Sequence, residues 1–234
     1  KASKLLIRDF GEIEKLQVSL KGPSDFVSNA DKKAEKIIIN ELTKARKKFS
    51  ILSEENGTQI NEDKENVWII DPIDGTNNFL HGIPHFAISI ALKSNNEIIS
   101  GLIYDPIKDE MFYAEKNNGA YLNNKSIRVS KRKTLEECLF ATGGKEIPNK
   151  EFYNSLTVRK SGSAALDIAY VAAGRFDGYF QKNLNLWDIA AGIIIAKEAG
   201  AYTNDIDLNK KNKIKAIISN NSISEKLLRN LGNF

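Results

Sequence analysis

The sequence predicts a layered α/β (α+β) sandwich, with an antiparallel sheet in the first half, a more parallel sheet in the second, and helices between and outside them. Residues 86–115 form successive strand-type runs separated by turn signals, which is typical of an antiparallel meander. From residue 139 onward, strand-type and helix-type runs alternate, which favours a parallel sheet with helices packed on it. We therefore expect one compact domain made of two halves, residues 1–137 and residues 138–234.

The first half begins with helix-type and strand-type runs that lead to the meander. The expected elements are, in order, a short helix, a strand, a longer helix, a short strand and the three meander strands, over residues 2–10, 16–20, 31–48, 49–52, 86–93, 97–104 and 110–115. Asp31 stands at the start of the longer helix, where an aspartate side chain caps free backbone N–H groups. The polar segment 61–66 is expected to be a loop.

The second half alternates between the two periodicities. We expect strands over residues 139–142, 176–181 and 216–219, and helices over residues 162–174, 187–200 and 222–231. Gly200 ends the second of these helices. Cys138 lies in the apolar run that opens this half, and we expect it to be a small core residue.

The composition is that of an ordinary globular protein. With 41% hydrophobic and 27% charged residues in a chain of 234, a disordered chain is excluded. No segment is apolar for long enough to cross a membrane, no secretory signal opens the sequence, and the single cysteine suits a reducing compartment, so we expect a cytoplasmic protein. The net charge of +4 comes from scattered lysines, which indicates a solvated surface more than a nucleic-acid interface.

The stretch around Asp71 and Asp74 predicts a metal site. An apolar strand-type run, Val67–Ile70, is broken by Pro72, so that the turn presents one aspartate on either side of the proline. Two carboxylates about 4 Å apart repel each other by roughly 4 kcal/mol at an effective dielectric near 20, which a cation relieves. Magnesium takes oxygen ligands together with substrate phosphate. The alternative is a plain β-turn, because these residue types also favour turns.

The whole string from Val67 to Phe79 resembles the metal-binding signature of the inositol monophosphatase family of magnesium-dependent, lithium-sensitive phosphatases. Gly75 begins what looks like the first turn of a helix, where backbone N–H groups attract an anion. The Trp187-Asp188 pair and the segment from Ser161 to Asp167 extend the resemblance, which is strongest to the bacterial SuhB-like branch. The fold of that family, shared with fructose-bisphosphatase-like proteins, agrees with the sandwich predicted above.

The resemblance implies a set of site residues. The ligands of two or three Mg²⁺ ions would be Glu54, Asp71, the carbonyl of Ile73, Asp74 and Asp188. The catalytic residues would be Glu54, Thr76 and Asp31, of which the first two orient a metal-activated water and the third orients the threonine. The substrate would contact Asp74, Gly75, Thr76, Ser163, Gln181 and Asp188. His81 and His85 are expected to be structural or rim residues, because imidazole suits magnesium poorly.

Position 181 departs from the family pattern, since inositol-specific relatives carry an acid seven residues before the Trp-Asp aspartate and this chain has Gln181. The substrate is expected to be a small phosphorylated metabolite, first of all inositol monophosphate. A nucleotide bisphosphate, fructose bisphosphate or histidinol phosphate is the enzymatic alternative. A second alternative is a SuhB-type regulatory partner of the RNA and transcription machinery. The resemblance also implies a homodimer formed through the second half, with no membrane partner.

Overall fold

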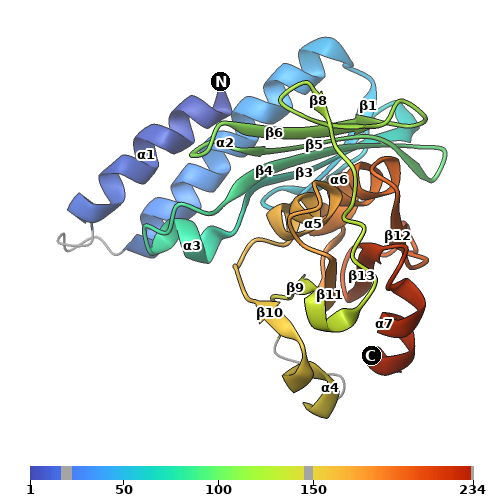
Figure 1. Cartoon of the computed structure of the whole chain (residues 1–234). Helices are drawn as coiled ribbons and strands as arrows, with labels where there is room; N and C mark the ends of the chain where they lie inside the picture. The colour runs from blue at the N-terminus through green and yellow to red at the C-terminus, as the bar shows by residue number, and fades with distance from the viewer. Residues whose placement is uncertain (17–22, 145–149, 233–234) are drawn as a thin grey trace.

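The computed structural model describes residues 1–16, 23–144 and 150–232, with only the backbone described for residues 14–16 and 23–28. Figure 1 shows layers stacked in the order of a helix pair, an eight-stranded sheet, a second helix pair, a five-stranded sheet and a last helix. The predicted layered sandwich is confirmed.

The larger sheet comes from the first half of the chain. Its strands are β1 (Phe49–Ser53), β2 (Gly57–Gln59), β3 (Asp63–Asp74), β4 (Ala87–Ser94), β5 (Glu97–Asp105), β6 (Glu110–Glu115), β7 (Ala120–Leu122) and β8 (Lys125–Ser126). They lie in the order β2-β1-β3-β4-β5-β6-β7-β8, and only β1 and β3 pair in parallel. From β4 to β8 each strand pairs with the next in the chain, so the predicted meander is confirmed.

The smaller sheet comes from the second half. Its strands are β9 (Leu139–Ala141), β10 (Thr157–Arg159), β11 (Gly178–Leu184), β12 (Ala201–Thr203) and β13 (Ile214–Asn220), in the order β10-β9-β11-β13-β12. Strand β9 is parallel to both of its neighbours, whereas β13 is antiparallel to both of its own. This sheet is therefore more parallel than the larger one, as predicted, but it is mixed.

The helices fill the space between the sheets and cover their outer faces. They are α1 (Ala2–Leu16), α2 (Pro23–Ala45), α3 (Thr76–Leu80), α4 (Lys150–Ser155), α5 (Ala164–Ala172), α6 (Leu186–Glu198) and α7 (Ser224–Leu231), with a 3₁₀ turn η1 (Leu135–Glu137). In Figure 1, α1 and α2 lie on the outer face of the larger sheet, α5 and α6 lie between the sheets, and α7 lies beside β13. Among the described residues, no helix is long and apolar enough to span a lipid bilayer.

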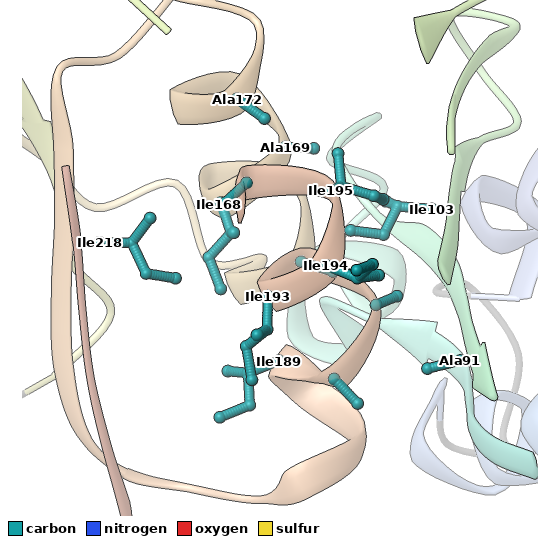
Figure 2. Packing of buried hydrophobic residues seen from close by; sticks show 14 of the residues in the cluster. Ala91, Ile103, Ile168, Ala169, Ala172, Ile189, Ile193, Ile194, Ile195 and Ile218 are labelled. Carbon is teal, nitrogen blue, oxygen red and sulfur yellow. The ribbon is translucent and has the colours of Figure 1, made fainter. Parts of the chain in front are cut away.

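Helix α6 is apolar on nearly every side because it packs against both sheets and against α5. Figure 2 shows Ile193, Ile194 and Ile195 pointing to different neighbours around this helix. Gly101 in β5 allows the close approach, since a Cβ atom there would lie 2.6 Å from Ile194 Cγ2 and 2.8 Å from the Ala191 carbonyl oxygen. The helix that carries Asp188 is thereby fixed against the sheet that carries Asp71 and Asp74.

Two local predictions differ from the structure. Helix α2 begins at Pro23, so Asp31 lies inside the helix and the predicted N-cap role is wrong. Proline is well suited to the first helical position, and the polar run that follows it hides the helix from apolar periodicity. The predicted loop over residues 61–66 is largely the start of β3, which tolerates polar side chains because this end of the sheet is solvated. The strand expected over residues 16–20 falls on residues outside the described chain, except for Leu16, which ends α1.

Helix α1 extends to Leu16, well past its predicted end at residue 10. The other predicted elements lie within a few residues of their predicted bounds, and Cys138 is buried as expected. It packs in the apolar cluster between the smaller sheet and α7. Burial raises the pKa of its thiol to about 12, which leaves it unreactive at neutral pH.

Candidate active site

The end of β3 places Asp71 and Asp74 on one side of the sheet. In a regular strand, residues three apart point to opposite faces. Here the pairing with β4 shifts by one residue, because Asp71 lies opposite Ser89 and Asp74 lies opposite Ala87. Pro72 lies inside this bulge, a position in a sheet where the missing N–H is tolerated. The Ile73 N–H donates to Asp71 Oδ1 at 3.0 Å and fixes that carboxylate.

The turn after Asp74 depends on a glycine. Gly75 has φ of 95°, and a Cβ atom there would lie 3.1 Å from the His85 carbonyl oxygen. The left-handed backbone ends the strand and starts α3 directly at Thr76. The Thr76 hydroxyl donates to the carbonyl of Ile73 at 2.9 Å, so the threonine side chain is turned back toward the bulge.

Glu54 follows β1, in the turn that leads into β2, and a buried acid of α2 holds this turn. Glu35 is fully buried, and its two oxygens accept from the Glu55 N–H at 3.0 Å and the Asn56 N–H at 3.1 Å. The Asn56 side-chain amide donates to the same carboxylate. Glu35 therefore orders the backbone on the carboxyl side of Glu54 and sets the direction of its side chain.

Asp188 enters from the second half, in the first turn of α6. Its Oδ2 accepts from the Asn185 N–H at 2.8 Å in a capping box, so one role of this side chain is to cap the helix. The carboxyl group also lines the cavity described below. Both roles hold together, because one oxygen is enough for the cap.

Asp74 is held from the second half. The Ser163 hydroxyl and the Ala165 N–H, the latter at 2.9 Å, both donate to Asp74 Oδ2. The same Ser163 oxygen caps α5 by accepting from the Leu166 N–H at 3.3 Å. Ser163 was predicted to contact substrate, and in the structure its hydroxyl proton is already directed to Asp74.

These side chains meet in one cavity of about 270 Å³ between the two halves. It is lined by Glu54, Asp71, Ile73, Asp74, Gly75, Thr76, Asn77, Gly143, Gly162, Ser163, Ala164, Asp167, Gln181, Leu184 and Asp188. No lysine or arginine is among these described lining residues. A larger cavity of about 750 Å³ lies near the C-terminal end of α6, but none of its described charged side chains is buried, so the smaller cavity carries the chemistry.

The acids of this cavity resist ionisation. Burial raises the pKa of Asp71 well above its usual range, and the charges of Asp74, Glu54 and Asp188 raise it further. Burial also raises the pKa of Asp74 to about 8, against the lowering effect of the Ser163 hydrogen bond, and that of Asp188 to about 6. Each carboxylate is therefore destabilised by lost water and by the others.

Glu54 differs from these acids because it lies at the rim and is exposed to solvent on part of its surface. The protein around it still removes enough water to raise its pKa to about 7, and the charge of Asp188 adds to the effect. Its exposure limits the size of the shift, while the direction follows first from the loss of water and then from the neighbouring charges.

Asp31 lies outside the lining of the cavity, on the same side of α2 as Glu35, one helical turn earlier. It is buried, its Oδ1 has no hydrogen-bond partner, and burial with the charges of Glu54 and Glu55 raises its pKa to about 8. No hydrogen bond joins it to Thr76 within the described chain, since the threonine hydroxyl donates to Ile73 instead.

The donor set fits a hard divalent cation. Five carboxylates line one small cavity together with Ile73, and magnesium prefers oxygen ligands of this kind. The orphaned oxygen of Asp31 nearby is a further group that lacks a positive partner. Among the described residues, however, no three His, Cys, Asp or Glu side chains lie close enough together to bind one metal ion in the present side-chain positions. The residues fit by chemistry and placement.

Gln181 and Asp167, both from the second half, also line the cavity. Gln181 Oε1 accepts from the Gly143 N–H and from the Tyr179 hydroxyl, each at 2.8 Å. Asp167, on α5, is 1% exposed, and its Oδ1 accepts from the Ser161 hydroxyl. Burial raises the pKa of Asp167 to about 7. Gln181 was predicted as a substrate contact, whereas Asp167 was not singled out.

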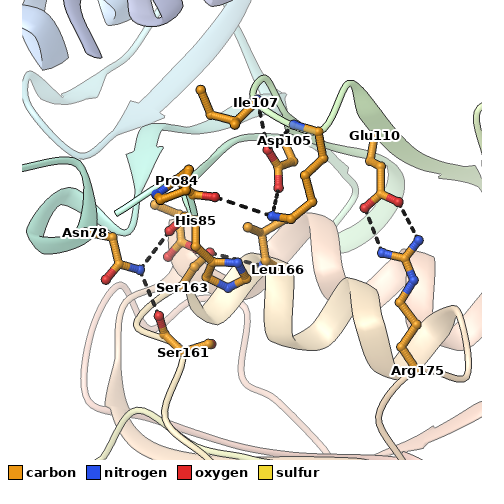
Figure 3. A network of polar contacts seen from close by, with 12 residues as sticks. Asn78, Pro84, His85, Asp105, Ile107, Glu110, Ser161, Ser163, Leu166 and Arg175 are labelled. Carbon is orange, nitrogen blue, oxygen red and sulfur yellow. Dashed lines mark hydrogen bonds and ion pairs between the residues drawn. The ribbon is translucent and has the colours of Figure 1, made fainter. Parts of the chain in front are cut away.

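Polar contacts join the two halves beside the cavity (Figure 3). The Asn78 amide of α3 donates to the His85 carbonyl at 2.7 Å and to the Ser161 carbonyl at 2.8 Å. Farther along, Arg175 forms a two-point ion pair with Glu110 of β6. The segment that leads into α5 is therefore hydrogen-bonded to the first half, which fixes the position of the two halves relative to each other at the cavity.

The structure brings nearly all predicted site residues to one cavity. Asp31 lies outside the lining, and neither His81 nor His85 is part of it. Two acids were missed by sequence reasoning, and each had a signal. Glu35 follows Asp31 by four residues on one helix, and Asp167 is a carboxylate inside the otherwise apolar run of α5.

The chain is similar to known proteins over most of its length. The inositol monophosphatase family matches residues 1–232 of the chain. The chain is 47% identical to an inositol-1-monophosphatase from Rhizobium meliloti over 218 residues, which cover 88% of this chain and 82% of that protein. It is 41% identical to Nus factor SuhB of Xylella fastidiosa over 215 residues, covering 87% of this chain and 78% of that protein. The crystal structure of extragenic suppressor protein suhB from Bartonella henselae superposes with a TM-score of 0.86 at 50% identity, covering 99% of this chain and 94% of that one.

Proposed function

This chain belongs to the inositol monophosphatase family, and on that premise we propose that it hydrolyses a small phosphate monoester with the help of magnesium, with inositol monophosphate as the first candidate substrate. One observation carries the proposal. Carboxylates from both halves, Glu54, Asp71 and Asp74 from the first and Asp188 from the second, line one cavity together with the Ile73 backbone. Such a cavity suits a phosphate only when cations stand between the two sets of negative charge.

Two or three Mg²⁺ ions would be held by Glu54, Asp71, the Ile73 carbonyl, Asp74 and Asp188. When bound, they supply the positive charge that offsets the phosphate oxygens and that lowers the pKa of a water molecule. The chain's own contribution is to fix the ligand oxygens. The Ile73 N–H orients Asp71, the Asn185 N–H orients Asp188, and donors at the start of α5 orient Asp74.

Glu54 is the residue that we assign to proton transfer. Its carboxylate lines the cavity beside the other proposed ligands, where it can accept a proton from the attacking water. The Thr76 hydroxyl, whose proton is directed to the Ile73 carbonyl, leaves its oxygen free to accept from the same water. Gly75 and Thr76 lie on the cavity wall, where their backbone would contact the phosphate.

The experiment is a phosphate-release panel with and without Mg²⁺. Inositol monophosphate, fructose bisphosphate, histidinol phosphate and a nucleotide bisphosphate are the substrates, and one variant, Asp71→Asn, is the control. We expect magnesium-dependent release from inositol monophosphate and little release by the variant. Absence of release from every substrate at saturating magnesium would overturn the proposal.

Three finer properties accompany this function. We expect lithium to inhibit the reaction. We expect the protein to form a homodimer through its second half, and we expect it to be located in the cytoplasm. Light scattering at micromolar concentration tests the dimer. A monomeric mass would refute it, and the segment from Gly143 to Thr157, which the family resemblance implies is shortened, would be the first place to look.

A second candidate function is suggested by the relatives named Nus factor SuhB, at 41% and 42% identity. The chain would then also act as a partner of the transcription machinery. Such a role does not need an intact cavity. The test is whether Asp71→Asn, without phosphatase activity, restores growth and transcription in a strain that lacks the protein. Rescue by this variant supports the role, whereas rescue by the active enzyme alone excludes it.

A further inference from the structure

We propose that Asp167 is a specificity-determining residue that accepts a hydrogen bond from a ring hydroxyl of a polyol phosphate, in place of the acid that is missing at position 181. This inference rests on the proposed phosphatase function and names the substrate class of that same site.

The position of Asp167 calls for a partner. It is one of the first residues of α5, a helix whose other residues in Ala164–Ala172 are apolar apart from Tyr170, and it is 1% exposed. The helix is already capped by Ser163, so Asp167 is not needed for that purpose. Burying a carboxyl group is costly unless it is hydrogen-bonded. The Ser161 hydroxyl donates to Oδ1, and Asp167 is one of the residues that line the cavity, so we assign its second oxygen to the ligand.

The neighbouring amide cannot serve as the acceptor. Gln181 Oε1 is committed to the Gly143 N–H and the Tyr179 hydroxyl, each at 2.8 Å. Gly143 must remain close, since a Cβ atom there would lie 2.6 Å from that oxygen. Gln181 therefore presents its NH₂ group, which only donates. On this side of the cavity, Asp167 supplies the carboxylate acceptor.

An acceptor next to a donor suits a hydroxyl group, which both donates and accepts. Asp167 and Gln181 line the same cavity of about 270 Å³ as the acids that would hold the phosphate. A small ring that carries hydroxyl groups would place them against this wall while its phosphate faces the acidic side. An aryl or alkyl phosphate without hydroxyls would leave Asp167 unpaired, and such unpaired buried groups are a strong source of discrimination.

The test compares wild type, Asp167→Asn and Ser161→Ala on two substrates, inositol 1-phosphate and p-nitrophenyl phosphate. Asparagine keeps the size of the side chain and its bond from Ser161, but it turns an NH₂ group toward the cavity. We expect kcat/KM for inositol 1-phosphate to fall about 10- to 100-fold, the loss given by one charge-assisted hydrogen bond. The aryl phosphate should change by less than about threefold, because the metal ligands are untouched. Ser161→Ala keeps the Asp167 carboxylate but removes the hydroxyl that orients it. This variant should lose less kcat/KM than Asp167→Asn, and the loss should again be larger on inositol 1-phosphate than on the aryl phosphate.

Equal losses on both substrates, or no loss on either, would overturn the inference while the phosphatase function stands. If Asp167→Asn fails to fold, the substrate preference of Ser161→Ala decides in the same way. If wild type releases phosphate from neither substrate, the proposed function fails, and the thermal shift caused by inositol 1-phosphate with Mg²⁺ tests Asp167 by itself. A shift of the same size in wild type and Asp167→Asn would then count against it.

Discussion

The two sides of the cavity differ in how their polar groups are balanced. On the acidic side, burial raises the pKa of Asp71, Asp74 and Asp188, and the charge of Asp188 raises the pKa of the other two further. No described lysine or arginine lines the cavity to offset them. On the opposite side, Gln181 and Asp167 receive hydrogen bonds from neutral donors. The acidic side is thus incomplete without a cation, whereas the opposite side is already a finished surface for a neutral polar ligand. The same cavity can therefore divide its work between charge and recognition.

The largest effect is expected from removing one charge on the acidic side. Asp71→Asn and Asp188→Asn should each lower kcat/KM on any phosphate substrate by more than about a thousandfold, because several kcal/mol of charge stabilisation depend on the ligand set. Asp207→Asn, an exposed acid at the larger cavity, is the matched control and should leave the rate unchanged. If Asp71→Asn turned over substrate nearly as fast as wild type at saturating magnesium, the claim that the acidic side carries the charge needed for the reaction would be contradicted.

The second prediction concerns the pH dependence of the metal-free protein. Burial and neighbouring charge raise the pKa of Asp74 to about 8 and that of Asp188 to about 6, above their unfolded values near 4. The folded state then holds protons more tightly than the unfolded state, so its stability is greatest at low pH and is lost as pH rises through the folded pKa values. We expect a loss of about 5 kcal/mol between pH 5 and pH 8.5, roughly 4 from Asp74 and roughly 1 from Asp188.

Chemical denaturation at several pH values measures this loss. Saturating Mg²⁺ should flatten the profile, and Asp71→Asn should reduce its slope without metal. A metal-free protein that gains stability over the same pH range would show that the acids are not in conflict.

A smaller effect is expected from the residue behind Glu54. Glu35→Gln replaces an acceptor oxygen by a donor that faces backbone N–H groups, which should cost about 1–3 kcal/mol and lower kcat about tenfold with little change in KM. Glu41→Gln, on the exposed side of α2, is the control.

Hydrogen exchange gives a second measure of this change. The amides of Glu55 and Asn56 should lose protection in Glu35→Gln, even without metal, if the carboxylate orders the turn. Unchanged protection, with a lower kcat, would mean that Glu35 acts by some other route.

The smallest effect is expected on the recognition side. Gln181→Glu keeps the acceptor for Gly143 and Tyr179 and turns the second atom from a donor into an acceptor. Because Asp167 already supplies one carboxylate, we expect kcat/KM for inositol monophosphate to rise only about two- to fivefold, less than a full charge-assisted hydrogen bond would give. The rate on an aryl phosphate should stay the same. An equal rise in kcat/KM on both substrates would mean that residue 181 acts on the phosphate chemistry and not on recognition of the ring.

Much of this arrangement was predictable from local patterns. Strand-type runs with turn signals gave the meander, and the paired aspartates around Pro72 gave the site, because both are set by neighbouring residues. The start of α2 was missed because a proline and a polar run carry no apolar period. Because the start of the helix is misplaced, the sequence predicts an N-cap role for Asp31, which in the structure lies inside the helix.

The recognition side was harder to predict because its contacts are long-range. The bond from Gly143 to Gln181 and the bond from Ala165 to Asp74 join residues far apart in the chain. Nothing in the pattern of α5 says that Asp167 faces a cavity and not solvent, since the helix is buried on nearly every side. Such placements follow from packing, and sequence spacing alone does not contain them.

Magnesium titration calorimetry in buffers of different ionisation enthalpy, near pH 7, tests the central claim most directly. The claim is that the buried acids of this cavity form a cation site. The acids must lose their protons to bind a metal, so binding should release protons, and Asp71→Asn should bind more weakly and release fewer. Binding without proton release, or with equal affinity in Asp71→Asn, would contradict the account.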